Sequence, residues 1–359
     1  MDTRQVLQAL QEGKISASQA KRALLNLLTP ATRTTATRFP ELVWLNRQTE
    51  GRPIFWIHGS GGGVEVYSKV AAMSQRPFYG IQARGWQSNR LPLQGIQAMS
   101  AAYVHAIQSL QPKGPYDLGG FSLGGTLAYE IARQLQEYGE TVSSIVLVDV
   151  LQLQGLDALP EEDSGEGGTK VLWWQTVNLL LTPYVTQVGH ADKVLIHRHT
   201  LDWNLDNDTF IDALLSAAAT TGFVQDRAAL YQLAAKSVAI QQAFETERYV
   251  YHPLPEPDKT QCYYFRNVNG QFLGDMLPYF SLNDTREKWL QQQPYWEGWK
   301  RYFPHFHTTD VIATNHMVML SENDALATFR SVLSGLYASG TRQDSSVDNP
   351  PLAAAGSIQ

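Results

Sequence analysis

Hydrophobic and polar positions follow two alternating patterns over the first half of the chain. Short, nearly unbroken apolar runs, typical of buried parallel strands, are separated by stretches with apolar residues at helical spacing. The runs predict strands over 41–46, 53–59, 76–84, 116–121 and 143–150, and helices near 66–73, 96–110 and 124–138. Strands and helices that alternate in this way predict βαβ units and a mostly parallel sheet, an α/β fold.

The pattern changes after residue 150. Residues 161–168 are acidic and glycine-rich, and residues 171–250 are predicted to form several consecutive helices that carry Trp173 and Trp174. Strand patterns return over 261–268 and 308–314, and a last helix is predicted over 323–337. A helical block inside an α/β core is typical of a lid, which we place at about 151–257, with 161–168 as its hinge.

The two ends of the chain fall outside this pattern. Residues 1–29 predict two short amphipathic helices, which are either a cap packed on the main domain or a docking or linker element. Residues 30–38 predict a linker, and residues 339–359, rich in Ser, Pro, Asp and Ala, predict a disordered tail. The main domain is therefore expected over 39–338.

Composition excludes several classes of protein. Hydrophobic residues make up 43% and charged residues 17%, which excludes wholesale disorder, and a net charge of −6 disfavours nucleic acid as a partner. The chain has no apolar run long enough to span a membrane, and its first residues lack the apolar region of a signal peptide. The single Cys262 forms no internal disulfide, and zinc-ligand spacing is absent. We expect a cytoplasmic protein without membrane contact or bound metal.

The sequence GFSLG at 120–124 carries the most specific chemical signal. G-x-S-x-G between a strand and a helix is the nucleophile elbow of the α/β-hydrolase fold, in which small residues flank a serine on a sharp turn. The alternative is an ordinary glycine-rich turn, but the predicted strand before it and helix after it favour the elbow. Ser122 is therefore the predicted nucleophile.

A serine nucleophile needs a base and an acid that orients the base. In this fold they follow in the order Ser, Asp or Glu, His, each at the end of a strand. Asp149 ends the strand 143–150, and His316 lies between the strand 308–314 and the last helix, whereas His305 and His307 precede that strand. Asp275, in the loop after the strand 261–268, is a second candidate for the acid.

The oxyanion hole requires two backbone N–H groups. Leu123, which follows the nucleophile, should supply one. The other should come from the glycine-rich loop 59–63, from Ser60 or from its neighbour Gly61, because glycines let the backbone approach a ligand closely. This loop lacks the Lys-Ser/Thr pair of a phosphate-binding P-loop. In the lid, Trp173 and Trp174 either line a substrate channel or pack the lid onto the core.

Together these segments resemble the terminal thioesterase domains of modular polyketide and nonribosomal peptide synthases. The resemblance runs from about residue 39 to 337 and is carried by FWIHGSGGGVEVYSKVA, PYDLGGFSLGGTLAYEIA and IVLVDV, while RPFYGIQARGW is most similar to thioesterases of trans-acyltransferase polyketide synthases. The sequence departs from the family's Gly-x-His-x-x-Met-Leu run at Thr314. The resemblance implies a lid between Asp149 and the next strand. It also implies an acyl chain delivered on the phosphopantetheine of an acyl carrier protein, with no cofactor bound by this chain itself.

The expected function is a serine thioesterase that releases a polyketide or polyketide-peptide chain, by hydrolysis or macrocyclisation, through an acyl-Ser122 intermediate. Its expected partners are an acyl carrier protein and, through residues 1–29, other synthase modules. A discrete editing thioesterase, a carboxylesterase or lipase, and a non-catalytic receptor of the same fold are the alternatives.

Overall fold

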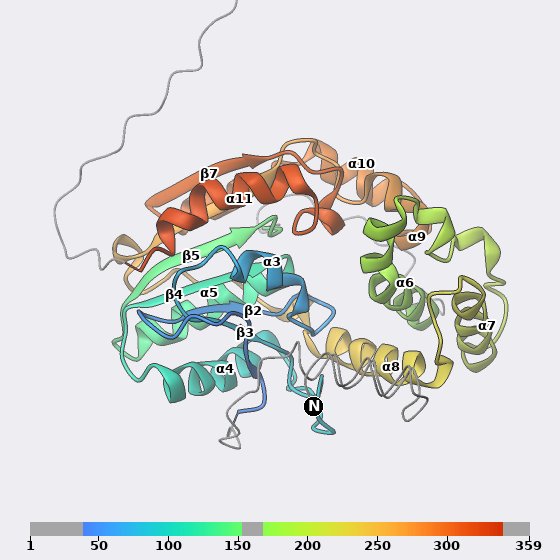
Figure 1. The fold of residues 1–359 in the computed structure, drawn as a ribbon, viewed down its shortest axis with the longest axis horizontal. Coiled ribbons are helices and arrows are strands. Elements are labelled where there is room, and N and C mark those ends of the chain that lie inside the picture. The colour runs from blue at the N-terminus through green and yellow to red at the C-terminus, as the bar shows by residue number, and fades with distance from the viewer. Residues whose placement is uncertain (1–38, 153–167, 340–359) are drawn as a thin grey trace, which may run out of the picture.

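The computed structural model describes residues 39–152 and 168–339 (Figure 1). Within them seven strands form one sheet in the order β1-β3-β2-β4-β5-β6-β7, in which β1 pairs antiparallel with β3 and all other neighbours are parallel. The strands are β1 (Leu42–Trp44), β2 (Ile54–Ile57), β3 (Phe78–Ile81), β4 (Tyr116–Phe121), β5 (Val142–Val148), β6 (Gln261–Asn267) and β7 (His305–Val311). The predicted mostly parallel sheet is confirmed. The predictions for residues 1–38, 161–167 and 340–359 lie outside the described residues.

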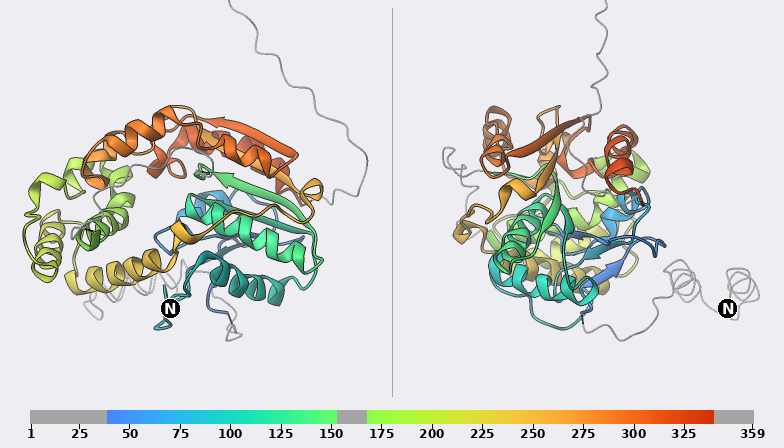
Figure 2. Two further views of the ribbon diagram at one scale, coloured as in Figure 1. Left: turned by 180° about the vertical axis from the view of Figure 1, so that it is seen from behind. Right: turned by 90° about the vertical axis from the view of Figure 1, so that its left-hand side faces the viewer.

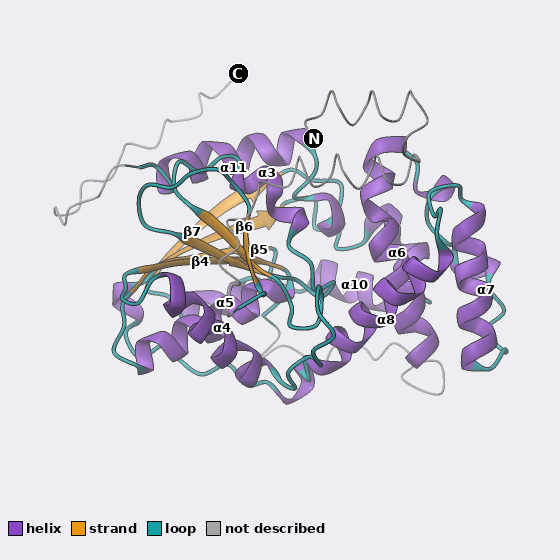
Figure 3. Ribbon diagram, turned by 60° about the horizontal axis from the view of Figure 1, so that its bottom comes forward, coloured by secondary structure: helices purple, strands orange, loops and turns teal. Residues whose placement is uncertain are grey.

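Helices cover both faces of the sheet (Figure 3). The helices α4 (Ile96–Leu110) and α5 (Leu123–Glu137) lie on one face, and α3 (Ser68–Ala71) and α11 (Asn323–Leu336) lie on the other. Strand β2 is buried throughout because its alternate side chains enter two hydrophobic clusters, Phe55 and Ile57 one, Ile54 and Trp56 the other. Burial on both faces explains the unbroken apolar run in the sequence.

A helical insertion between β5 and β6 contains α6 (Gly168–Val188), α7 (Asn207–Thr220) and α8 (Arg227–Ala243). The consecutive helices predicted in this region are confirmed. They lie at the end of the sheet toward which the parallel strands point (Figures 1 and 2). Their hydrophobic cluster has Trp174, Phe210 and Leu214 among its most buried members, and it also includes Tyr279 and Phe280 from the segment between β6 and β7.

The region between β6 and β7 differs from the sequence prediction. It contains α9 (Leu277–Phe280) and α10 (Thr285–Gln292), which had not been predicted, and the final strand begins at His305 instead of residue 308. The placement of His305 and His307 before this strand was therefore wrong, since both lie within β7. Pairing of Gln261 with His305 extends the strand, and the His307 ring stacks on Tyr263 at 5.1 Å.

Candidate active site

Ser122 lies on a strained turn between β4 and α5. Its backbone has φ 54° and ψ −131°, a left-handed conformation that is costly for a residue with a side chain. The turn requires glycine on both sides. A Cβ on Gly120 would collide with the backbone of Gly124, and a Cβ on Gly124 would collide with the carbonyl of Ile57. The amide of Ser122 donates to the carbonyl of Val148 at 3.0 Å, which places the elbow beside the end of β5.

Asp149 and His316 form a buried hydrogen-bonded pair. Asp149 follows β5 with φ 47°, and His316 lies in a short turn between β7 and α11. The distance from Nδ1 of His316 to Oδ2 of Asp149 is 2.8 Å, and the two residues are 3% and 0% exposed. A carboxylate only accepts hydrogen bonds, so Nδ1 of His316 is the donor and Nε2 of the neutral ring is left as a proton acceptor.

Two aromatic rings hold the imidazole between them. Phe121, the residue before the elbow serine, stacks on one face of His316 with ring centroids 4.4 Å apart, and Phe272 stacks on the other face at 4.1 Å. The amide of His316 also donates to the carbonyl of Phe272 at 2.9 Å. The stack on Phe121 puts His316 next to the turn that carries Ser122.

Asp275, the second candidate for the acid, has a different partner. Its side chain is exposed, and its Oδ1 accepts a hydrogen bond from Nδ2 of Asn315 at 2.8 Å. Oδ1 of Asn315 in turn accepts from the amide of Met317 at 3.0 Å, which caps the turn containing His316. Of the two carboxylates, Asp149 is the one hydrogen-bonded to the imidazole.

The glycine-rich loop 59–63 follows β2 and lies against the elbow, since a Cβ on Gly59 would be 3.4 Å from the carbonyl oxygen of Phe121. His58 holds the first peptide of this loop, the one between Gly59 and Ser60, in place. Nδ1 of His58 lies 2.8 Å from the carbonyl oxygen of Gly59, and Nε2 lies 2.9 Å from the hydroxyl of Tyr103. Burial lowers the pKa of His58 to about 4, so the ring is neutral, donating through Nδ1 and accepting from Tyr103 through Nε2.

The same peptide carries the N–H of Ser60, the predicted oxyanion donor. Its carbonyl, that of Gly59, accepts from both His58 and the amide of Gly62, the latter at 3.1 Å. Because a trans peptide is planar with C=O and N–H on opposite sides, fixing the carbonyl fixes the direction of the Ser60 N–H. Sequence reasoning did not identify His58, although it directly precedes the glycine run.

The helical insertion contacts this loop. Leu179 of α6 packs so closely on Gly61 that an added Cβ would lie 3.3 Å from its Cδ2, and Oγ of Ser237 in α8 donates to the carbonyl of Gly61 at 3.2 Å. Trp173 and Trp174 are instead buried inside the insertion. Trp174 donates through Nε1 to the carbonyl of Ile196 at 2.7 Å, and Trp173 stacks on Tyr231 at 5.5 Å. Both contacts are internal to the insertion.

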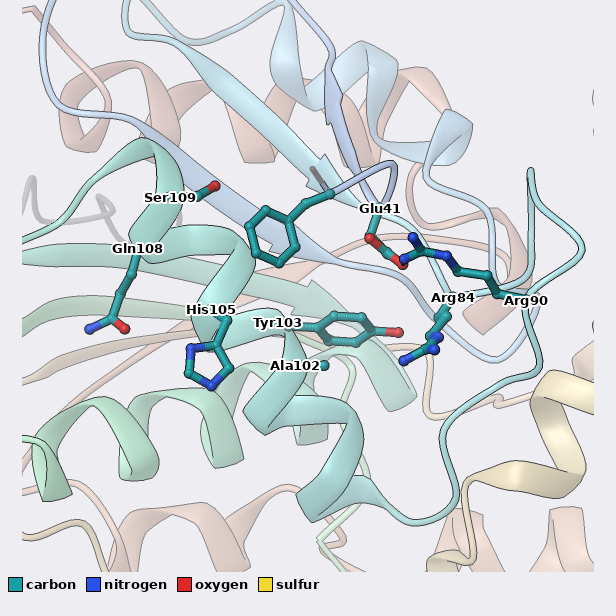
Figure 4. Close-up of a pocket in the computed structure, with 9 residues that line it drawn as sticks. Glu41, Arg84, Arg90, Ala102, Tyr103, His105, Gln108 and Ser109 are labelled. Atoms are coloured by element: carbon teal, nitrogen blue, oxygen red, sulfur yellow. The ribbon is translucent and has the colours of Figure 1, made fainter. Parts of the chain in front are cut away.

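The cavity shown in Figure 4 has a volume of about 690 Å³ and is lined by α4 and by residues before β1 and after β3, including Glu41, Arg84 and Tyr103. Neither Ser122 nor His316 lines it, and it is linked to the glycine-rich loop through the Tyr103–His58 hydrogen bond.

Among the described residues, His, Cys, Asp and Glu form no cluster arranged to hold a metal ion. Within the same residues, no helix is both long enough and apolar enough to cross a bilayer.

A mostly parallel sheet with helices on both faces, a serine elbow after β4 and an insertion after β5 define an α/β-hydrolase fold. The chain belongs to the thioesterase domain family, which matches residues 52–333. This membership implies hydrolase activity.

Relatives of the chain include a polyketide synthase and a nonribosomal peptide synthase. The chain is 41% identical over 302 residues to polyketide synthase PksR of Bacillus subtilis, covering 84% of this chain and 12% of PksR. It is 42% identical over 100 residues to a dimodular nonribosomal peptide synthase of the same organism, covering 27% of this chain and 4% of the relative. The chain thus spans about an eighth or less of the length of these proteins. It is a thioesterase domain related to those of polyketide and nonribosomal peptide synthases.

Solved structures agree in fold. A four-domain nonribosomal peptide synthetase, holo-AB3403 bound to AMP and glycine, matches with a TM-score of 0.60 and 20% identity over 83% of this chain and 20% of that one. The wild-type Vlm2 thioesterase domain matches with a TM-score of 0.51 and 15% identity over 81% of this chain and 95% of that one. At such identities the likeness shows the fold alone.

Proposed function

We propose that this domain releases an acyl or acyl-peptidyl chain from the phosphopantetheine arm of a carrier protein through an acyl-Ser122 intermediate. The observation that carries the proposal is the buried Asp149–His316 pair, stacked against the residue that precedes Ser122. The sequence similarity to polyketide synthase PksR supports a polyketide-type substrate bound to a carrier protein. A carrier protein is then the partner, and residues 1–29 are the segment proposed to contact other modules.

The first half-reaction transfers the chain to the serine. Oγ of Ser122 attacks the thioester carbonyl while Nε2 of His316 accepts the hydroxyl proton, and the N–H groups of Ser60 and Leu123 stabilise the oxyanion. Asp149 holds the ring in the tautomer that leaves Nε2 free and stabilises the imidazolium. When the intermediate collapses, the C–S bond breaks, and His316 returns the proton to the departing pantetheine thiolate.

The second half-reaction frees the chain. Water, or a hydroxyl or amine of the chain itself, attacks the acyl-Ser122 ester while His316 accepts its proton. Collapse breaks the ester bond, and the proton passes to Oγ of Ser122. Water gives a free acid, whereas an internal nucleophile gives a macrocycle.

The test is Ser122→Ala, assayed with acyl-pantetheine and acyl-carrier substrates and by mass spectrometry of the intact protein. The matched control is Ser331→Ala, which removes an exposed hydroxyl on α11. We expect Ser122→Ala to lose turnover by about 10⁴-fold or more together with the acyl adduct, and Ser331→Ala to keep both. Turnover of Ser122→Ala within tenfold of the parent would refute the serine mechanism.

The choice of substrate separates the alternatives. Preference for long acyl-carrier substrates supports chain release, and preference for short acyl groups on carriers indicates an editing thioesterase. Efficient turnover of simple esters, with none of carrier-bound chains, indicates a carboxylesterase or lipase.

A further inference from the structure

A tyrosine hydroxyl forms a hydrogen bond with the carboxylate oxygen of Asp149 that does not contact His316. Tyr295 lies just after α10 and is 6% exposed, and its hydroxyl is 2.9 Å from Oδ1 of Asp149, while Oδ2 faces His316. The carbonyl of Tyr295 also accepts from the amide of Gln152 at 2.8 Å, which ties the tyrosine to the segment that follows Asp149. The two carboxylate oxygens therefore have separate partners.

The direction of this hydrogen bond follows from the environment of the tyrosine. Burial, and next the negative charge of Asp149, raise the pKa of Tyr295 well above its ordinary value. The phenol keeps its proton, and the carboxylate only accepts, so Tyr295 donates. Charge-assisted hydrogen bonds of this kind are stronger than neutral ones and fix the geometry of the group they reach.

The same stretch of chain also supports the imidazole. Glu287 of α10 is buried, and its carboxylate accepts from the amides of Phe272 and Leu273, each at 2.9 Å, and of Gly274 at 3.3 Å. Phe272 then stacks on His316. The segment between β6 and β7 thus holds both members of the pair, the acid through Tyr295 and the ring through Phe272.

We propose that Tyr295 is a positioning residue for the Asp149–His316 pair, whose hydroxyl holds Oδ1 of the carboxylate so that Oδ2 faces Nδ1 of the imidazole. The inference rests on the proposed function, because it matters only if the pair acts as base and acid. Tyr295 keeps its proton throughout and forms no bond with the acyl chain. Its ring is buried and its hydroxyl is engaged, so its loss should lower kcat and leave KM unchanged.

The experiment compares Tyr295→Phe with Tyr129→Phe in the full chain. Tyr129 is a matched control, because it is fully buried and donates its hydroxyl to the carbonyl of His252 at 2.7 Å. With an acyl-pantetheine thioester, we expect Tyr295→Phe to lose about 10- to 100-fold in kcat at unchanged KM. Tyr129→Phe should stay within about twofold, with thermal melts confirming that both variants fold. Equal kcat values for the two variants would overturn the inference.

A double variant separates positioning from general loss of structure. Asp149→Asn and Tyr295→Phe both disturb the orientation of the His316 imidazole, so their fold-losses in kcat should not multiply. The double variant should be no more than about threefold slower than Asp149→Asn alone, and fully multiplied costs would overturn the inference. Ser122→Ala belongs in the same series. If Ser122→Ala stays active, the proposed function fails; if Ser122→Ala is inactive while Tyr295→Phe matches Tyr129→Phe, only the role of Tyr295 fails.

Discussion

Replacing Asp149 with asparagine should prevent His316 from acting as the base, because the proton of its imidazole ring would move from Nδ1 to Nε2. The Tyr295 hydroxyl donates to Oδ1, so the amide of Asn turns its carbonyl oxygen to the tyrosine and its NH₂ to Nδ1 of His316. An NH₂ group only donates, so Nδ1 must accept and the ring proton moves to Nε2. Nε2 then has no free lone pair with which to accept the hydroxyl proton of Ser122 in the proposed mechanism.

The size of this effect follows from the same geometry. An imidazole held in the wrong tautomer typically costs about 10⁴ in kcat, which corresponds to about 5 kcal/mol of transition-state stabilisation. Asp275→Asn is the matched control, because the bond from Asn315 needs an acceptor, which the asparagine carbonyl also supplies. We expect less than a threefold loss for Asp275→Asn.

The assay is release of pantetheine thiol from an acyl-pantetheine substrate, followed from pH 6 to 9 so that a shifted optimum is not mistaken for a loss. Thermal melts of both variants establish that each folds. A loss of less than tenfold for Asp149→Asn, together with a loss of about 10³ for Asp275→Asn, would show that Asp275 is the acid and that the tautomer argument is wrong.

Three further predictions concern stability and the helical insertion. Glu287→Ala leaves three backbone amides without their acceptor and should cost about 3 kcal/mol in urea unfolding; an unchanged unfolding midpoint would contradict this role. Because its pKa is lowered to about 4, His58 binds a proton more readily in the unfolded chain than in the folded one. The free energy of unfolding should therefore decrease by up to about 3 kcal/mol as the pH is lowered from 6.5 to about 4, and His58→Gln should flatten this dependence. Trp174→Ala should cost about 3–5 kcal/mol and lower the rates for short and long acyl chains equally; a loss confined to long chains would instead support a channel.

Local patterns in the sequence were sufficient to predict the sheet and the elbow. The unbroken apolar run of β2 and the strand–glycine–serine–glycine–helix succession each depend on neighbours a few residues away, so periodicity and steric rules identify them. The order of the strands along the chain likewise predicted where Asp149 and His316 would lie, each after the end of a strand. Residues 305–307 were misassigned because the extension of β7 depends on pairing with β6, which is 44 positions away in the sequence.

Only the tertiary structure decided which groups meet. Asp149 and Asp275 were both candidates by position, and the hydrogen bond that distinguishes them joins residues 167 positions apart. Tyr295 reaches Asp149 across 146 positions, from the stretch between β6 and β7 in which no helix or strand had been predicted. Such contacts leave no local signal, because a side chain's partners depend on how whole elements pack against one another. Sequence spacing placed Ser122, Asp149 and His316 at one edge of the sheet, and packing decided which side chains contact Asp149 and His316.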